Sequence, residues 1–315
     1  MMPGTLDAVS NAGHSVDLLS HEGPPATDQL CRAVHGAAAI VCLLSDRIDE
    51  RVLAAGLPTL RVVANVAVGV DNIDLGAARR LGVTVCNTPG VLDAATADLA
   101  MALLLAVCRR VVEGDGVVRR GEWTGLSMEG PLGRDLAGMR LGIVGYGRIG
   151  KRVAARAAAF DMDVRHHARR DTHEPGYVAD LDELLRWSDA ISLHVPLTDE
   201  TRHLLDARRL GLLRAGAIVV NTARGPVLDE AALASALVDG RIGGAGLDVF
   251  DDEPHVSRRL LEAPNTVLTP HVGSATTETR AAMCAMAADA VVTVLAGRPY
   301  PFVIAGPGEA RSADG

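Results

Sequence analysis

The sequence predicts an α/β protein built from doubly wound parallel sheets, and two observations support this. From about residue 140 onward, short apolar runs alternate with helix-like stretches. Strands that alternate with helices are typical of βαβ units, which place helices on both faces of a parallel sheet. The chain has 315 residues, of which 48% are hydrophobic, so it is long enough for two folded domains.

The second half of the chain predicts one six-stranded domain. Two stretches between its apolar runs, "LDELLRW" and "EAALASALVDG", are typical of helices, and Gly240 is the expected C-cap of the second. Six strands match the size of a doubly wound dinucleotide-binding domain. The predicted strands are 140–145, 163–167, 190–195, 217–221, 245–250 and 266–270.

The first ninety residues predict a second, smaller α/β region. A helix ending near Gly13 leads into a predicted strand at 15–19, whereas such a domain normally opens with a strand before that helix. We therefore expect the first strand to be missing, or its place to be taken by another segment. A long amphipathic helix follows Gly273, and the tail 306–315 is expected to be frayed. The remaining strand candidates of this region are 37–45, 61–68 and 82–90.

Composition excludes several classes of partner and site. The net charge of −8 argues against nucleic acid or an anionic membrane as a partner. Five cysteines show no CxxC pair and no metal-ligand spacing, so we expect reduced, mostly buried thiols in a cytoplasmic protein without a metal site. No signal peptide is evident, and the most apolar window, 100–108, is too short to span a bilayer.

A glycine pattern, "GIVGYGRIGK", follows the first strand of the second domain and opens a helix. Gly145 allows the tight turn, Gly147 lets the backbone approach a pyrophosphate, and Gly150 lets helix and strand pack closely. Unpaired N–H groups at the helix N-terminus favour the anion. This context predicts a Rossmann dinucleotide site rather than a glycine-rich structural turn.

The segment "HHARRD" ends the next strand, where an acidic residue usually binds the adenosine ribose. Ala168 removes that acceptor and its repulsion of a 2′-phosphate. Arg169 and Arg170 supply forked donors suited to a phosphate. The sequence therefore predicts that NADP(H) is favoured over NAD(H). The alternative is that both arginines are solvated, and Asp171 is close enough to pair with one of them.

Three later segments place polar residues at the ends of predicted strands, where ligands bind in this architecture. Arg224 suits a bidentate hold on a carboxylate, and His271 suits proton exchange near neutral pH. A carboxylate on the other ring nitrogen would fix the tautomer. "DVFDDEP" offers four acids, and the residues alone leave open which one meets the histidine. The set suits the reduction of a 2-oxo acid.

The chain resembles the D-isomer-specific 2-hydroxyacid dehydrogenases over almost its whole length. Within that family it is most similar to the glyoxylate and hydroxypyruvate reductase branch, in which an Arg-containing segment after the second strand often accompanies NADP use. The motifs that carry the resemblance are "NVAVGVDNID", "NTPGVLDAATADLAMALLLA", "GIVGYGRIGK", "SLHVPLTDETRHLLD", "NTARGPVLDE", "AGLDVFDDEP" and "TPHVGSAT".

The resemblance assigns roles to matching residues. Arg224 would bind the substrate carboxylate together with the amides of Val68 and Gly69, His271 would donate the proton, and Glu253 would be its partner. Asp248 would contact the nicotinamide carboxamide. The cofactor-binding residues expected are Thr96, Gly145, Gly147, Arg148, Ile149, Gly150, Ala168, Arg169, Arg170, Val195, Pro196, Thr222, Ala223, Asp248 and Gly273.

The resemblance also implies a Rossmann NAD(P)-binding domain (94–283) inserted into a flavodoxin-like substrate domain (1–93 with 284–305), with a cleft that closes on substrate. It implies a homodimer whose interface includes the helix from about Ala95, extending toward Trp123. Burial of that helix within one subunit is the alternative.

"NVAVGVD" contains no Lys or Arg for a phosphate group, so we expect a small 2-oxo acid, glyoxylate or hydroxypyruvate, reduced to the D-2-hydroxy acid. No regulatory domain is expected after the last helix. Three alternatives stay open: a bulkier 2-oxo acid, a dinucleotide-sensing co-repressor-like binding protein, and a chain that folds poorly without its first strand.

Overall fold

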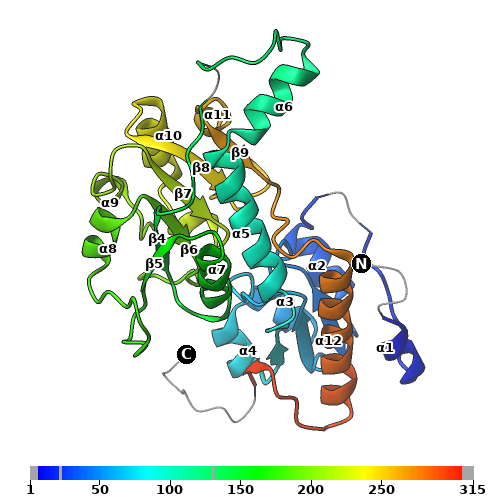
Figure 1. Cartoon of the computed structure of the whole chain (residues 1–315). Helices are drawn as coiled ribbons and strands as arrows, with labels where there is room; N and C mark the ends of the chain where they lie inside the picture. Colours follow the sequence, from blue (N-terminus) through cyan, green and yellow to red (C-terminus); the bar gives the residue numbers. More distant parts are fainter. Residues whose placement is uncertain (1–5, 21–22, 130–131, 307–315) are drawn as a thin grey trace. The chain divides into compact units, whose positions relative to one another are not determined.

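The computed structural model describes residues 6–20, 23–129 and 132–306 (Figure 1). The chain divides into a discontinuous unit, Met1–Leu92 with Thr276–Gly315, and an inserted unit, Asp93–Ala275. The predicted α/β class is confirmed, because the two units contain a four-stranded and a six-stranded sheet. The predicted boundary at 283/284 is wrong, since it cuts α12 (Thr277–Leu295), one continuous helix of the discontinuous unit.

The six strands of the inserted unit are all parallel, in the order β5-β4-β6-β7-β8-β9. The chain runs from β4 to β5 on one side and then returns to β6 on the other side of β4. Ligands of doubly wound sheets bind at the carboxyl ends of the strands beside such a reversal. The strands are β4 (Arg140–Val144), β5 (Asp163–His167), β6 (Ala190–Leu193), β7 (Ala217–Asn221), β8 (Ile242–Leu247) and β9 (Thr266–Leu268).

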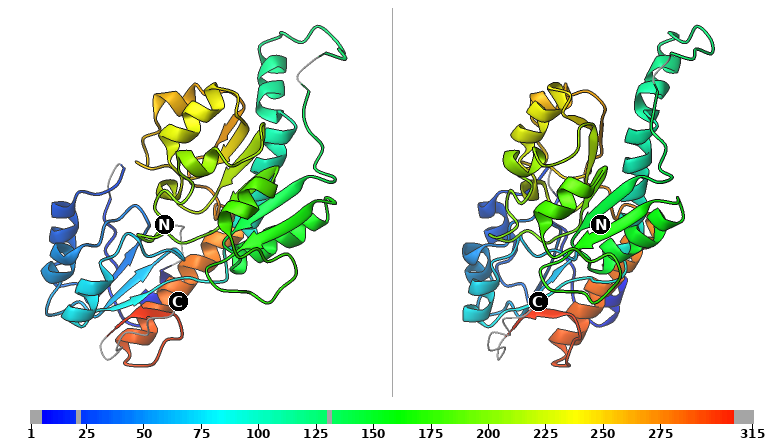
Figure 2. Two further views of the ribbon diagram at one scale, coloured as in Figure 1. Left: turned by 90° about the vertical axis from the view of Figure 1, so that its left-hand side faces the viewer. Right: turned by 60° about the vertical axis from the view of Figure 1, so that its left-hand side comes forward.

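Helices cover both faces of this sheet (Figure 2). On one face α5 (Asp93–Cys108) packs against α7 (Arg148–Ala158) over a core that includes Leu103, Leu104, Leu141 and Ile143. On the other face α8 and α10 enclose a second core around Leu184, Ile191 and Leu233. The remaining helices of the unit are α6 (Val111–Arg119), α8 (Leu181–Trp187), α9 (Ala207–Leu210), α10 (Glu230–Val238) and α11 (Arg258–Leu261), with a 3₁₀ turn at Gly225–Val227.

The helix expected to extend from Ala95 toward Trp123 is interrupted, which corrects that prediction. Arg110 has φ +52°, a left-handed conformation that ends α5 and lets α6 begin at Val111. Helix α6 ends at Arg119, so Trp123 lies in the loop beyond it. Figure 1 shows α6 and this loop leading away from the sheet of the inserted unit.

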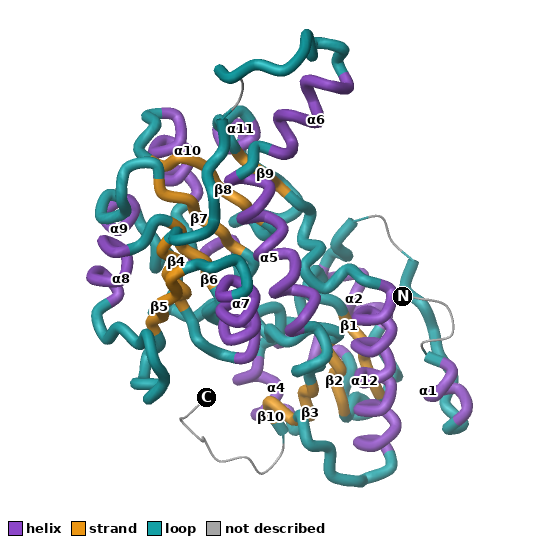
Figure 3. Tube along the Cα trace, viewed as in Figure 1, coloured by secondary structure: helices purple, strands orange, loops and turns teal. Residues whose placement is uncertain are grey.

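The discontinuous unit has a sheet of order β1-β2-β3-β10, drawn in orange in Figure 3. Strands β1 to β3 are parallel as expected, whereas β10 pairs antiparallel with β3 and was missed, because only three residues form it. The elements are α1 (Asp7–Asn11), α2 (Thr27–Ala33), β1 (Ala39–Cys42), α3 (Glu50–Ala55), β2 (Val62–Asn65), α4 (Leu75–Leu81), β3 (Thr84–Cys86), α12 and β10 (Val303–Ala305).

The start of this unit differs from the prediction in one respect. Helix α1 ends near Gly13 as expected and packs against α12, but the strand predicted at 15–19 does not form. Leu18 is 73% exposed, so the segment buries no apolar face against the sheet. An isolated extended segment can satisfy neither its backbone groups nor its apolar side chains by pairing. Among the described residues no strand precedes β1.

The prediction of reduced, mostly buried cysteine thiols is confirmed. All five cysteines are free, and four of them, Cys42, Cys86, Cys108 and Cys284, are buried. No helix in the described part of the chain has the length and apolarity needed to cross a membrane. Of the predicted tail, only Gly306 falls within the described residues.

Candidate active site

The glycine loop between β4 and α7 is held by close backbone contacts. Gly145 has φ +96°, and a Cβ there would lie 2.5 Å from the carbonyl oxygen of His194. A Cβ at Gly150 would lie 2.2 Å from the carbonyl oxygen of Gly145. At Gly147 no described atom other than those of adjacent backbone and neighbouring residues lies within 4 Å of the Cβ position. The first and third positions therefore exclude side chains, while the second leaves the backbone open to a ligand.

The first turn of α7 faces this loop. Gly147 is the N-cap residue of α7, and no side chain caps its first N–H groups. Such a terminus attracts anions through its unpaired N–H groups and its dipole. The Nε of Arg148 lies 3.2 Å from Oδ2 of the buried Asp93, which orients the arginine from the start of α5. Ile149 packs against the core beneath the loop.

The segment after β7 carries Thr222, Ala223 and Arg224. Asn221 orders it, because its Nδ2 donates to the carbonyl oxygen of Arg224 (2.9 Å) and its Oδ1 accepts from the N–H of Ala223 (3.0 Å). The guanidinium of Arg224 donates to the carbonyl oxygen of Ala223 (2.7 Å). The hydroxyl of Thr222 is buried without a hydrogen-bond partner among the described residues. A buried hydroxyl of this kind normally has one, so a ligand is a fitting partner.

His271 and Glu253 form the charged pair of the site. Nδ1 of His271 lies 2.8 Å from Oε2 of Glu253, and the N–H of Phe250 donates to the other carboxylate oxygen (3.0 Å). Burial raises the pKa of Glu253, but the bond and charge of His271, the bond from Phe250 and the charge of Arg224 together lower it below 4.5. The glutamate is therefore a carboxylate near neutral pH, and it is the acid of "DVFDDEP" that meets the histidine.

Asp248 anchors the loop that carries the histidine. It is 1% exposed, and its Oδ1 accepts from Thr269 Oγ1 (2.6 Å) and from the N–H of Val272 (2.8 Å). Its Oδ2 accepts from the N–H of Gly273 (2.8 Å), and the carbonyl oxygen of Gly273 accepts weakly from Thr96 (3.4 Å). The N–H of His271 donates to the carbonyl oxygen of Asp248 (2.9 Å), and His271 has φ +51°. These bonds hold His271 in a left-handed conformation.

The arginine segment leaves β5 directly. Ala168 is half-buried, while Arg169 and Arg170 are exposed. The side chain of Asp171 accepts from the N–H of His173 (2.8 Å). A hydrogen bond from Thr198, one to the backbone of Glu200 itself and the charge of Arg169 lower the pKa of Glu200.

Val195 and Pro196 follow β6 at the same edge of the sheet. A Cβ at Gly145 would lie 2.9 Å from Cγ1 of Val195, so this valine borders the glycine loop. The carbonyl oxygen of Pro196 accepts from the hydroxyl of Thr201 (2.6 Å), which fixes the turn. Together with the effect of Arg169 on Glu200, these contacts bring the predicted adenosine wall near the arginine segment.

Val68 and Gly69 belong to the discontinuous unit and follow β2. The carbonyl oxygen of Val68 accepts from Asn87 (2.8 Å), and that of Gly69 accepts from Asn65 (2.8 Å). Among the described residues, none accepts a hydrogen bond from the N–H of either residue. The loop is thus held through its carbonyl groups, with two amides available to an anion.

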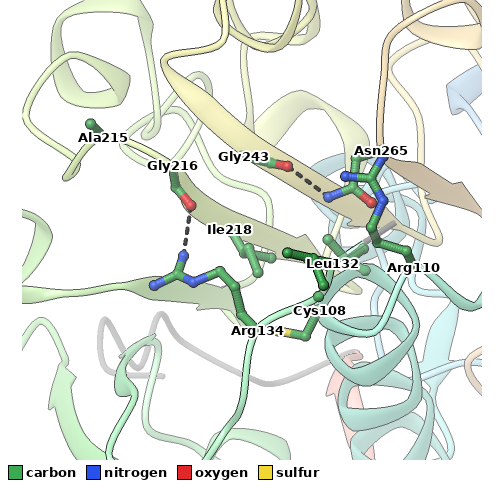
Figure 4. Close-up of a pocket in the computed structure, with 11 residues that line it drawn as sticks. Cys108, Arg110, Leu132, Arg134, Ala215, Gly216, Ile218, Gly243 and Asn265 are labelled. Carbon is green, nitrogen blue, oxygen red and sulfur yellow. Dashed lines mark hydrogen bonds between the residues drawn. The ribbon is translucent and has the colours of Figure 1, made fainter. Parts of the chain in front are cut away.

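The pocket in Figure 4 lies at the opposite edge of the six-stranded sheet. Gly216, Gly243 and Asn265, which lie at the amino ends of β7, β8 and β9, help to enclose about 300 Å³. The guanidinium of Arg134 donates to the carbonyl oxygen of Gly216 (2.8 Å), and Asn265 donates to that of Gly243 (2.6 Å). This pocket is therefore separate from the residues after the carboxyl ends. No metal-binding group of His, Cys, Asp or Glu occurs among the described residues.

Three residues that matter to this geometry were not predicted. Asn221 orders the Arg224 segment, Thr269 bonds to Asp248, and Asp93 orients Arg148. Asn221 ends a buried apolar strand, and a polar residue in that position is a detectable signal. The ion pair between Asp93 and Arg148 joins residues 55 positions apart and needs the packing of α5 on α7.

Comparisons with known proteins agree with this arrangement. The profile described as "D-isomer specific 2-hydroxyacid dehydrogenase, NAD binding domain" matches residues 101–273. The chain is 43% identical to the glyoxylate reductase of Thermococcus litoralis, over 92% of this chain and 90% of that protein. It is similar to the crystal structure of a protein from Thermus thermophilus, with a TM-score of 0.91 and 46% identity over 96% of this chain and 97% of that one.

A further similar structure has both a cofactor and an acid bound. It is the NADPH-dependent glyoxylate/hydroxypyruvate reductase of Sinorhizobium meliloti in complex with NADP and malonate. Its TM-score is 0.81, and the two chains are 34% identical over 89% of this chain and 88% of that one. The glycine loop, the open amides and the paired histidine and glutamate fit an NAD(P)-dependent reaction on a 2-hydroxy or 2-oxo acid, and the chain belongs to the D-isomer specific 2-hydroxyacid dehydrogenase family.

Proposed function

We propose that this protein reduces a small 2-oxo acid, glyoxylate or hydroxypyruvate, to the D-2-hydroxy acid with NADPH. The observation that carries the proposal is the bond of 2.8 Å between His271 and Glu253, with Arg224 near enough for its charge to act on the same carboxylate. A proton donor and a cation for the acid group thus lie together at the carboxyl ends of the strands. The relatives named glyoxylate reductase support the choice of substrate.

His271 holds the proton that the carbonyl oxygen of the substrate receives. Because Nδ1 faces Glu253, the proton available to substrate is on Nε2. The carboxylate fixes this orientation and the tautomer of the ring. Arg224 binds the substrate carboxylate, with further contacts from the amides of Val68 and Gly69. The nicotinamide, when bound, supplies the hydride.

The dinucleotide site combines backbone and side-chain contacts. Gly147 and the N-terminal amides of α7, which include those of Arg148 and Ile149, would bind the pyrophosphate. Thr222 offers its unpartnered hydroxyl to the cofactor. Asp248, with Thr96 and Gly273, would contact the nicotinamide when it is bound, and the three hydrogen bonds of Asp248 help to place His271.

The preference for NADPH is part of the proposal. Ala168 offers no acceptor to the ribose hydroxyls, and the exposed Arg169 and Arg170 follow it at the end of β5. Guanidinium groups bind phosphate through paired N–H donors. Val195 and Pro196 border the same place and would form the wall against the adenosine.

We also propose a homodimer formed through α6 and the loop after it. This part of the inserted unit exposes large apolar side chains, and such patches mark interaction surfaces. Size-exclusion chromatography with light scattering tests it: Leu126→Asp should give a monomer, whereas a dimer in that variant would exclude this surface. The exposed side chains are Val111, Val112, Val118, Trp123, Leu126, Met128 and Leu132.

Initial rates test the activity directly. Glyoxylate, hydroxypyruvate and a bulkier 2-oxo acid such as 2-oxoisocaproate are each assayed with NADPH and with NADH. We expect turnover of the first two, faster with NADPH. Faster turnover of the bulkier acid would mean that the substrate is a larger 2-oxo acid than the one proposed. Tight NADPH binding without turnover of any acid would favour a dinucleotide-sensing protein instead.

A further inference from the structure

We infer that His166 and Thr172 are positioning residues for dinucleotide selectivity. Their side chains join the two ends of the segment that carries Arg169 and Arg170 and tie that segment to the glycine loop. The inference rests on the proposed use of a dinucleotide with a 2′-phosphate. His166 and Thr172 would hold Arg169 and Arg170 in place to bind that phosphate.

The first contact closes the arginine segment on itself. Nε2 of His166, in β5, lies 2.7 Å from Oγ1 of Thr172, six residues further on. The same hydroxyl oxygen accepts from the N–H of Glu174 (3.3 Å), so its own proton is free to point to the imidazole. Ala168, Arg169, Arg170 and Asp171 lie between the two bonded residues. The loop that presents both arginines is thus bounded by one side-chain bond.

The backbone of His166 adds to this bracing. Its N–H donates to the carbonyl oxygen of Gly176 (2.9 Å), and its carbonyl oxygen accepts from the N–H of Val178 (2.8 Å). The neighbouring His167 bonds through Nδ1 to the carbonyl oxygen of Val178 (3.0 Å). The chain therefore returns alongside β5 directly after the arginines, and His166 lies at the point of return.

The second set of contacts reaches the glycine loop. The ring of Tyr146, between Gly145 and Gly147, stacks on the ring of His166 with centroids 3.5 Å apart and planes at 13°. Tyr177 packs on His166 at 5.9 Å. Lys151 of α7 forms an ion pair with Glu174 and lies 5.7 Å from the ring centroid of Tyr146. His166 is therefore 1% exposed between the two parts of the dinucleotide site.

This arrangement has a consequence for selectivity. The glycine loop meets the pyrophosphate, which NADH and NADPH share, whereas the arginine segment meets the 2′-phosphate, which only NADPH carries. Two long arginine side chains on an untethered loop lose conformational freedom on binding, and this opposes affinity. A loop held by His166 and Thr172 has less freedom to lose.

Thr172→Val is the test, because valine keeps the shape of threonine and removes both bonds of the hydroxyl. The probes are 2′,5′-ADP and 5′-AMP, measured as competitive inhibitors against NADPH in the intact enzyme. The two nucleotides differ by the 2′-phosphate alone. Thr172→Ser, which keeps the hydroxyl, is the rescue variant. Thr293→Val makes the same change at a half-buried threonine of α12 that bonds to Asp289.

We expect wild type to bind 2′,5′-ADP more tightly than 5′-AMP. In Thr172→Val that ratio should fall about fivefold, as expected when the bond to His166 no longer holds the arginine segment. The inhibition constant of 5′-AMP should stay within about twofold, and Thr172→Ser and Thr293→Val should keep the wild-type ratio. A merely structural effect would weaken both nucleotides together.

Two results would overturn the inference in different ways. A wild-type ratio well above one that survives in Thr172→Val would exclude the positioning role and leave the preference for NADPH standing. A wild-type ratio near one would overturn the preference itself, and the inference with it. If Thr172→Val does not fold, Thr172→Ala is measured against Thr172→Ser in its place.

Discussion

His271 and Glu253 meet at 2.8 Å from segments that follow two neighbouring strands, β9 and β8. The glutamate divides its oxygens between His271 and the N–H of Phe250, so the contact is held from both sides. Parallel pairing of β8 and β9 brings the carboxyl ends of both strands together. The pair is thus a product of sheet register, and the chemistry proposed for this protein depends on it.

Removing either member of this pair should remove most of the activity. His271→Gln lacks a proton donor, so kcat should fall about 100-fold or more. Glu253→Gln leaves the imidazole without its carboxylate, and kcat should fall about tenfold or more. Steady-state glyoxylate reduction gives these values, and fluorescence titration with NADPH should give a dissociation constant near that of wild type. Near-normal turnover in either variant would remove that residue from the mechanism.

Ala168→Asp should shift the cofactor preference toward NADH. A carboxylate there can accept from the ribose hydroxyls and repels a 2′-phosphate, so the ratio of kcat/KM for NADPH over NADH should fall about tenfold or more. Ala296→Asp, which adds the same charge at an exposed residue after α12, should leave the ratio unchanged. An unchanged ratio in Ala168→Asp would mean that Arg169 and Arg170 do not select the cofactor.

Two alanine substitutions in the glycine loop should have different effects, one on stability and the other on cofactor binding. In Gly150→Ala the new Cβ would lie 2.2 Å from the carbonyl oxygen of Gly145, so α7 must shift and the free energy of unfolding should fall by about 2 kcal/mol or more. In Gly147→Ala the new Cβ meets no described atom within 4 Å beyond adjacent backbone and neighbouring residues, so thermal stability should hold while NADPH binds more weakly. Calorimetry and titration separate the two effects. Equal stability of both variants would contradict the close packing at Gly150.

Asp182 should contribute to stability in a pH-dependent way. Hydrogen bonds and charges of Arg208 and Arg209 lower its pKa from 3.8 to about 2. A lowered pKa stabilises the folded state above pH 3.8, and the contribution is lost as the pH falls toward 2. After solvent screening, Asp182→Asn should cost about 1 kcal/mol at pH 7 and less at pH 3.

Urea unfolding followed by tryptophan fluorescence at both values of pH measures this difference. Asp199→Asn, at an exposed position, is the control. A gap between wild type and Asp182→Asn that does not narrow at acid pH would show that the carboxylate charge is not its source.

Most strands of the inserted unit were predictable because they are apolar runs closed by a glycine or a polar residue, whereas β5, with the sequence DVRHH, contains a single apolar residue. The glycine loop was predictable for a related reason, since Gly145 has a positive φ in the turn and Gly150 is required by its contact with Gly145, both within one strand–turn–helix unit. The pairing of Glu253 with His271 could not be predicted from the periodicity of the sequence, because "DVFDDEP" offers four acids within seven residues. Only the resemblance to the family singled out Glu253, and the structure places it against the histidine.

Other features depend on contacts that the sequence pattern does not record. The segment 15–19 alternates like a strand, but none of the described strands pairs with it, so local pattern gave the wrong prediction. Strand β10 forms because β3 offers an edge to a short segment more than 200 residues away. In the sequence His166 is only the first of two adjacent histidines. Its stacking on Tyr146 depends on the parallel pairing of β4 and β5, which the local pattern does not show.

The left-handed backbone of His271 bears on how the residue can be replaced. A backbone with φ +51° is adopted most easily by glycine and asparagine and least easily by β-branched residues. The residue at position 271 must therefore meet two requirements: it must carry a transferable proton, and it must accept a left-handed backbone conformation. A saturation library at this position should separate the two requirements: Asn and Gly variants would be well folded and inactive, while Val and Ile variants would also lose expression and thermal stability.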